Sequence, residues 1–527
     1  MKQTMKHQSL LSGIKSLGIM LSLGLALASC TKDDVAQNPA TPNEEENKNL
    51  TTFVAGGEIK TRTSLDYNSS DFSWEAGDYI YVKDDDGVLQ KSTNAPDQKV
   101  ASFNYKVPGK FTASSSYKIY YFGKNSSNNQ VVIPSAQSQS TPNNTEHFGV
   151  SGDYGTATAK KVTGKNQFVF ELEHQAAYLV FHPYVSNTLL QNCYLTKIEV
   201  SSDNDIASTY TLSASTGTLQ SVNTGAEADK EIILSTKGSG TYANGFPLNT
   251  ASDNVAVNGA YMVIKPGTHT LKVRYWLKDV STGIEGTVTK AFKAFNYDVN
   301  NYYDIDGNLN IRDYDGDHYY MWDAKEQYWK GHEWWSANKD QPVLNGNDNG
   351  NDPKDNNDSR WYNEGSGSSL NATQSCATLP NVNEMTWYAA YGEPRWDADE
   401  LWTTMGHLYK GGMWFKKKAV LQGEGHYNSN TAADGTDWRA TTARAEQTWP
   451  VSPSLPSAAD AGNYFYLPAL GTYAYGGLNY VGDEGVYWSS SASLWNSGSA
   501  YVLDFYSDGI DVGVYGCDAG YRVGGFE

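Results

Sequence analysis

The sequence predicts a mainly β protein, with two tandem β-sandwich domains followed by an α+β domain. Between residues 50 and 312, apolar side chains recur with a period of two in short runs that end at turn residues. The chain holds 37 tyrosines and 49 glycines, which favours strands joined by turns over helices. After His318 the composition changes, because most of the 15 tryptophans lie beyond that point.

Two runs show the alternation clearly. Phe168–Leu172 and Leu271–Leu277 each place apolar side chains on one face, so each is predicted to be a strand with one buried face. The turn signals Asp85–Gly87 and Pro266–Gly267 stand between such runs. In the second run the residues predicted to face away from the core are Thr270, Lys272, Arg274 and Trp276.

The region after residue 373 predicts two short helices and several strands. One helix should begin at Asn381 and end at Gly392, and the other should run from Asp397 to Gly411; each cap is followed three residues later by a glutamate. Leu401, Met405 and Leu408 would make the second helix amphipathic. The predicted strands are Tyr464–Leu467, Tyr501–Phe505 and Ile510–Tyr515. The predicted divisions are sandwiches at 50–180 and 181–312, an aromatic then Asn/Asp/Gly-rich linker at 313–372, and a last domain at 373–527.

The N-terminus predicts export. A basic leader precedes the apolar run Leu17–Ala28, which is too short to span a membrane and reads as the core of a cleaved signal peptide, residues 1–29. Small residues before Cys30 resemble the lipobox of bacterial lipoproteins, which implies cleavage between Ser29 and Cys30 and acyl chains, palmitate among them, on Cys30. The alternative is an ordinary signal peptide followed by a chance cysteine. Lys32–Asp34 resembles the surface-export signal of Bacteroidales lipoproteins, and residues 30–49 should form a flexible tether at the outer membrane.

Charge and cysteine content exclude some classes of protein. The net charge is −19, and loss of the three lysines in residues 1–29 would make it more negative still, so nucleic acid is not an expected partner. Of the four cysteines, Cys376 and Cys517 could pair in an oxidising compartment, which leaves Cys193 as a lone buried thiol. No Cys/His spacing suggests zinc.

The region from Leu50 to Arg312 resembles the fimbrillin family, the pilus subunits of Bacteroidales. The motifs that carry the resemblance are Thr61-Arg62-Thr63, Trp74-Glu75-Ala76-Gly77-Asp78, Phe170-Glu171-Leu172-Glu173-His174-Gln175-Ala176-Ala177 and Asn301-Tyr302-Tyr303-Asp304-Ile305. The resemblance implies two transthyretin-like β-sandwiches. It also implies that a trypsin-like protease cuts between Arg62 and Thr63, releasing a strand within 50–60 from the edge of the first sandwich. A strand of another subunit would then fill the exposed groove. The alternative is an ordinary exposed arginine in a turn.

The last domain resembles the Fibrobacter succinogenes major paralogous domain, which is related to C-type-lectin-like folds. The matching segments are Leu379–Met385, Leu467–Ala469, Gly485–Ser490, Ala500–Leu503 and Gly520–Val523. In that fold a cysteine near the first helix lies close to one in the last strand. Because Cys376 and Cys517 occupy those places, the resemblance implies a disulfide between them.

The sequence offers no catalytic or metal constellation. Glu171, Glu173 and His174 share one strand, but alternation puts Glu173 and His174 on opposite faces, which favours a structural histidine. The acidic repeat at 304–308 starts like a calcium loop, but Leu309 replaces the needed glycine and Asp315 the terminal glutamate. Asp313, Asp315 and Asp317 could also chelate calcium, but turns are the better explanation for both repeats. We therefore expect no enzyme activity, no cofactor and no metal.

These observations predict a pilus tip adhesin. The chain ends directly after the expected last strand, so it could accept a strand but offers none to donate. Trp488 and Trp495, on either side of a serine-rich loop, are the candidate ligand contacts for a host glycan or protein. The expected partners are other pilus subunits, through a donated strand, and the membrane, through the lipid on Cys30. The alternative is a glycan-binding surface lipoprotein of the outer membrane that never polymerises.

Overall fold

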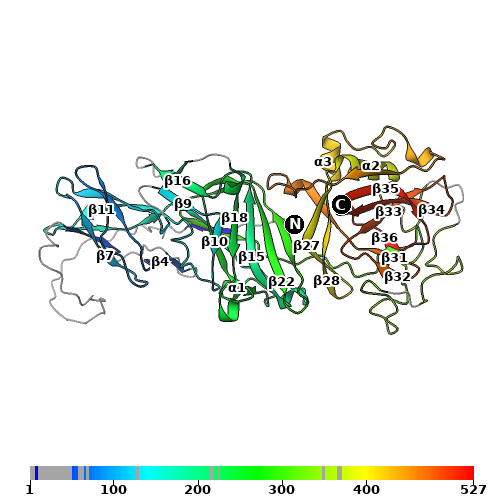
Figure 1. The fold of residues 1–527 in the computed structure, drawn as a ribbon, viewed down its shortest axis with the longest axis horizontal. Coiled ribbons are helices and arrows are strands. Elements are labelled where there is room, and N and C mark those ends of the chain that lie inside the picture. Colours follow the sequence, from blue (N-terminus) through cyan, green and yellow to red (C-terminus); the bar gives the residue numbers. More distant parts are fainter. Residues whose placement is uncertain are drawn as a thin grey trace, which may run out of the picture.

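The computed structural model is elongated, with three β-rich parts that follow one another along its length (Figure 1). The structure describes residues 6–9, 50–56, 64–66, 71–125, 130–213, 219–222, 226–346, 350–364 and 371–527. Strands dominate and the helices are short, which confirms the predicted mainly β class. Within these residues no helix is long and apolar enough to cross a membrane.

The first part is a sheet that closes around its own apolar core. Its strand order is β6 (Leu89–Lys91), β5 (Tyr81–Lys83), β8 (Ser116–Tyr121), β11 (Gly155–Lys161), β12 (Gln167–Phe170), β2 (Leu50–Ala55) and β7 (Phe103–Pro108), with β13 (Glu173–His174) paired to β11. The hairpin β3 (Ser64–Asp66) and β4 (Asp71–Ser73) lies outside this order. Phe53, Trp74 and Phe168 are fully buried in the core. Burial of such rings is the main force that holds the sheet together.

The second part contains a short sheet and most of a long one. The short sheet has the order β1 (Lys6–Ser9), β25 (Asn301–Ile305), β14 (Ala177–Phe181) and β20 (Ala260–Ile264). The long sheet begins with β10 (Ala136–Ser138), β18 (Glu231–Ser235), β15 (Cys193–Ser202), β22 (Leu271–Asp279) and β23 (Glu285–Ala291), and β19 (Phe246–Pro247) joins β15. Smaller pairings join β17 (Leu219–Ser221), β16 (Ser208–Leu212) and β9 (Gln130–Ile133), and β21 (Gly267–His269) with β24 (Phe295–Tyr297).

The first two parts are interleaved along the chain. Strands β9 and β10, at residues 130–138, pair with strands of the second part before the chain returns to form β11, β12 and β13. Residue 180 lies inside β14, which belongs to the second part. The helix α1 (Val255–Asn258) precedes β20. The two sandwiches are therefore joined by several chain crossings rather than by one linker.

The third part continues the long sheet and adds a second one. The long sheet passes from β23 to β27 (Arg395–Thr404), β28 (His407–Lys416) and β30 (Tyr464–Pro468). The second sheet has the order β26 (Tyr319–Tyr320), β36 (Tyr521–Arg522), β33 (Gly485–Ala492), β34 (Ser499–Tyr506), β35 (Gly509–Gly516) and β29 (Gln447–Pro450). A hairpin of β31 (Thr472–Ala474) and β32 (Gly477–Asn479), the helix α2 (Val382–Tyr391) and the helix α3 (Lys418–Gly423) complete this part.

One predicted helix forms and the other does not. Helix α2 has the predicted capping box between Asn381 and Glu384 and stops at Gly392. The predicted helix from Asp397 to Gly411 is wrong, because this segment is the hairpin β27–β28. Its turn contains Met405 and Gly406, both with positive φ (48° and 76°). Two consecutive residues of this kind form the tight turn that matches the twist of a hairpin.

The predicted aromatic linker is also incorrect for its first part. Trp322, Tyr328 and Trp329 are buried in the clusters of the third part, and β26 pairs with β36. Large aromatic side chains are stabilised by burial, whereas a linker would leave them in solvent, so a cluster of them favours a packed segment over a linker. The third part therefore begins near residue 313 rather than 373.

Candidate functional site

The slot occupied by β2 in the first sandwich is the first candidate site. β2 pairs with β12 in parallel on one side and with β7 in antiparallel on the other. The predicted strand within 50–60 is therefore present at Leu50–Ala55, but it lies inside the sheet and not at its edge. Its alternate side chains Thr51, Phe53 and Ala55 are buried. This pattern of one buried face explains why the segment folds as a strand.

Phe53 is the main anchor of β2. Its ring is stacked on Phe168 at 5.0 Å and meets Phe111 edge-on at 5.1 Å. The side chain has no exposed surface. Removing β2 would therefore leave an aromatic socket and two rows of unpaired backbone groups, a surface that another strand could fill.

The Trp74–Asp78 motif links the two strands that flank β2. Trp74 contacts Tyr105 of β7 at 5.4 Å and Phe170 of β12 at 6.3 Å, both edge-on. Asp78 fixes this turn, because its carboxylate accepts hydrogen bonds from the Glu75 backbone N–H (2.7 Å) and the Tyr121 hydroxyl (2.9 Å). These contacts hold β7 and β12 together without β2, so a slot could persist after β2 leaves.

The predicted processing residues Ser29, Cys30, Arg62 and Thr63 lie outside the described residues. Residues 6–9 of the predicted signal peptide are described, and they pair in antiparallel register with β25 as strand β1.

The two tryptophans proposed as ligand contacts have different environments. The prediction for Trp488 is wrong, because its ring is fully buried and its Nε1 donates to the Tyr320 carbonyl at 2.7 Å. Its place on a strand buried on both faces explains the burial. Trp495 is 50% exposed, with the Arg444 guanidinium 5.7 Å from the ring centroid.

Cys376 and Cys517 lie in one buried cluster with Trp488, as the resemblance implies, but both are free thiols and the predicted disulfide is not formed. Burial raises the pKa of Cys376 to about 12 and also raises the pKa of Cys517. Cys193 is likewise buried and free. All three thiols are therefore protonated at neutral pH, and they act here as small apolar core residues.

The other polar residues that the sequence suggested as candidates make contacts that stabilise the fold. His174 is buried, and its Nδ1 lies 3.0 Å from the Asp153 carboxylate, which also accepts from the Tyr178 hydroxyl at 2.6 Å. Glu173 is exposed on the opposite face, as alternation predicts. In the acidic repeats, Asp306 accepts a bond from the Asn308 backbone N–H at 3.1 Å, which is a turn contact. Across the described ranges no group of three or more His, Cys, Asp or Glu side chains is arranged to hold a metal.

The seam between the second and third parts contains charged residues that the sequence did not reveal as buried. Arg274 of β22 donates to Asp397 of β27 at 2.9 Å. Glu400 accepts bonds from the Thr287 and Thr289 hydroxyls of β23, at 3.0 and 2.6 Å. Burial, with the nearby Asp397 carboxylate, raises the pKa of Glu400 to about 7. The third part covers the face of β22 that was predicted to meet solvent.

Comparisons with known proteins give only distant likenesses. No protein-family profile and no curated protein matches the chain. Among solved structures, a Bacteroides ovatus protein provisionally assigned to cell adhesion covers 47% of this chain and 89% of its own, at 12% identity and TM-score 0.28. The fimbrial anchor protein Mfa2 of Porphyromonas gingivalis covers 45% and 80%, at 14% identity and TM-score 0.22. A fimbrial protein of Bacteroides ovatus covers 90% and 98%, at 10% identity and TM-score 0.24. Likenesses at these identities and TM-scores establish neither the family of this chain nor its function.

Proposed function

We propose that this chain is a surface-exported pilus subunit that serves as a tip adhesin. It is exported as a lipoprotein on Cys30, cut after Arg62 and joined to its neighbour by strand replacement in the β2 slot. The third part carries ligand binding. The observation that carries the proposal is the position of β2, which is paired on both sides and buried along one face.

The order of the chain supports this proposal. Arg62 lies between β2 and β3, so a cut there would leave β2 held only by non-covalent contacts. Strand β1 also precedes Arg62 and covers the edge of β25. Because β1 lies within the predicted signal peptide, the cut between Ser29 and Cys30 would already remove it and expose the edge of β25 in the second sandwich. The cut after Arg62 would then remove β2 and open a slot in the first sandwich. Unpaired strand edges of this kind accept a donated strand readily.

Substitution of Arg62 by alanine tests assembly. Wild-type and Arg62→Ala chains are expressed in a piliated Bacteroidales host, and the purified pili are analysed by immunoblot and N-terminal sequencing. We expect the wild-type chain in pili to begin at Thr63, and Arg62→Ala to remain in the membrane fraction with lipid on Cys30. Lys60→Ala is the matched control and should assemble normally.

Equal incorporation of Arg62→Ala and wild type would refute the proposed processing. A chain that keeps Cys30 and is never found in pili would instead support the non-polymerising glycan-binding lipoprotein.

A further inference from the structure

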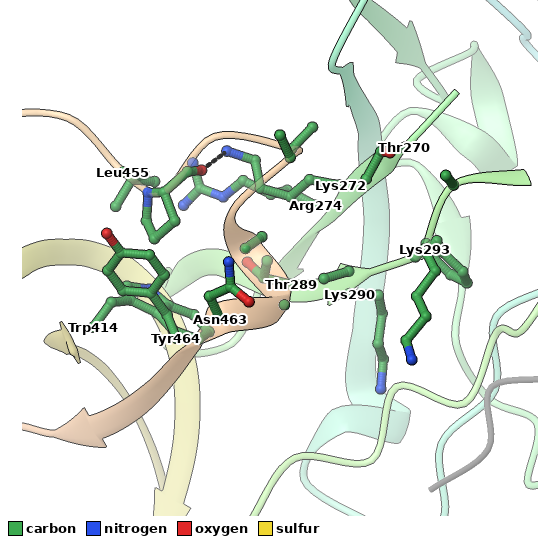
Figure 2. Close-up of a pocket in the computed structure, with 18 of the residues that line it drawn as sticks. Thr270, Lys272, Arg274, Thr289, Lys290, Lys293, Trp414, Leu455, Asn463 and Tyr464 are labelled. Atoms are coloured by element: carbon green, nitrogen blue, oxygen red, sulfur yellow. Dashed lines mark hydrogen bonds between the residues drawn. The ribbon is translucent and has the colours of Figure 1, made fainter. Parts of the chain in front are cut away.

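A cavity of about 1150 Å³ lies at the seam between the second and third parts. Strands β22 and β23 form one wall, and the segment 455–464 with Trp414 forms the other (Figure 2). The loop at 306–310 borders it as well. Lys293 at its rim is exposed, so the cavity is open to solvent there. Its volume is slightly above the usual range of about 300–1000 Å³ for small-molecule sites.

The charge of this cavity is opposite to that of the chain. Five cationic side chains line it, against two carboxylates, in a chain of net charge −19. One of the carboxylates, Asp397, is already neutralised by Arg274. The cationic residues are Lys272, Arg274, Lys290, Lys293 and Lys417. A concave, positively charged site on a negative molecule attracts anions selectively.

Three of the cations have partners within the protein, and Arg274 is paired with Asp397. Lys272 donates to the Pro456 carbonyl at 2.8 Å, and Lys417 donates to the Gly462 carbonyl at 2.6 Å. Lys290 and Lys293 differ from these, because among the described residues neither makes a hydrogen bond or salt bridge. Figure 2 shows both side chains extending toward the same side of the cavity.

Burial makes the positive charge of Lys290 costly without an anion, and it leaves one N–H donor of Arg274 without a partner. Lys290 is half-buried, and burial lowers its pKa, while Asp306 opposes that shift without forming a salt bridge to it. Arg274 is only 7% exposed, and its Nε is buried without a hydrogen-bond partner. Buried charges and donors of this kind are normally satisfied by a bonding partner.

The remaining lining residues indicate the class of ligand. Trp414 and Phe295 offer aromatic surface, and the exposed amide of Asn463 lies between Tyr464 and Thr289 in Figure 2. Rings with neighbouring amides and hydroxyls suit a sugar. An acidic peptide suits the cavity less well, because β22 lies between β15 and β23, and β23 lies between β22 and β27. Neither strand has a free edge on which a peptide could add.

We propose that this cavity binds an acidic saccharide, with Lys290 and Lys293 holding its carboxylate or sulfate groups. The inference rests on the proposed adhesin function, for which it names the class of ligand. It places the ligand at the seam, on residues of both the second and the third part, rather than on the third part alone. It does not depend on cleavage at Arg62.

Titration calorimetry on the full secreted chain tests the proposal. The probes are a hyaluronan hexasaccharide, a heparin hexasaccharide, neutral maltohexaose and hexaglutamate. We expect wild type to bind at least one acidic saccharide and neither control probe. Lys290→Gln/Lys293→Gln should weaken that binding about tenfold or more, a loss of at least one good charged contact. Lys290→Arg, which keeps the charge, should retain it.

The matched control is Lys161→Gln/Lys165→Gln, which removes two exposed lysines from the first sandwich and should bind as wild type does. Binding of neither acidic saccharide by wild type, equal weakening by both double variants, or preference for hexaglutamate would overturn the proposal. Incorporation of Lys290→Gln/Lys293→Gln into pili reports separately on assembly, so the two proposals can fail independently.

Discussion

Replacing Phe53 by alanine should loosen β2 within an otherwise intact protein. The ring is fully buried and touches Phe168 and Phe111, so its loss leaves a cavity between β2 and the sheet. Truncation of a buried phenylalanine costs about 3–5 kcal/mol. At 1.4 kcal/mol per factor of ten, opening of β2 becomes about 100- to 4000-fold more frequent.

Hydrogen–deuterium exchange with mass spectrometry measures this opening directly, because slowly exchanging amides report the free energy of local unfolding. We expect faster exchange in peptides covering β2, β7 and β12. The core of the second part is a separate cluster, so β18 should keep its protection. Val54→Ala is the matched control, since Val54 is partly exposed on the opposite face of β2 and should change exchange less than tenfold. An exchange rate of β2 in Phe53→Ala within tenfold of wild type would refute the role of Phe53 as the anchor.

Two further predictions concern the third part. Asp397→Asn leaves Arg274 buried without its counter-charge, so the free energy of unfolding measured by urea titration should fall by about 3–5 kcal/mol, and Arg274→Met in the same chain should restore part of it. Glu484 and Asp504 share a partly buried site. Burial, and then the nearby Asp504 carboxylate, raise the pKa of Glu484 to about 7. Burial, together with the Asp511 carboxylate, raises the pKa of Asp504 to about 6. Because the folded pKa values exceed the unfolded ones, the contribution of this pair to stability should be greatest below about pH 4 and fall as the pH rises toward 7. Glu484→Gln/Asp504→Asn should flatten this part of the curve of melting temperature against pH; an unchanged curve would contradict the assignment.

Local signals in the sequence were sufficient for much of the fold. The strand at Leu271–Asp279 follows from alternation of apolar side chains, and helix α2 follows from its capping box. Each of these signals acts over a few neighbouring residues, so it can be read without knowing what packs against the segment.

The hairpin β27–β28 shows where such signals fail. Asp397 and Glu400 imitate the spacing of a helix cap, yet both side chains bind β22 and β23 across the seam. Leu401, Trp402 and Thr403 are buried together, so both faces of the strand are covered and no period of two remains. Tertiary contacts thus determined the secondary structure of a segment whose local pattern favoured a helix.

For the same reason, the sequence alone could not predict the cavity as a binding site. Lys272 and Arg274 alternate with apolar residues, which is the pattern of a strand with a solvated face. Only residues 397–464 of the third part, more than a hundred residues further along the chain, convert that face into a wall of the cavity. The one available hint was the pair of lysines at 290, on the next strand, and 293, just after it, in a chain of strong negative charge.

The two proposed sites lie in different parts of the molecule but are joined by packing. One buried cluster includes Tyr120 and Phe122 of the first part, the core of the second, and Leu401 and Leu408 of the third. The long sheet also crosses the seam from β23 to β27. Interiors packed in this way resist bending, so a subunit docked in the β2 slot would fix the direction in which the cavity faces. A pulling force on a saccharide held by Lys290 and Lys293 would pass through β23 and the second sandwich to the donated strand, which places assembly and ligand binding on one continuous mechanical path.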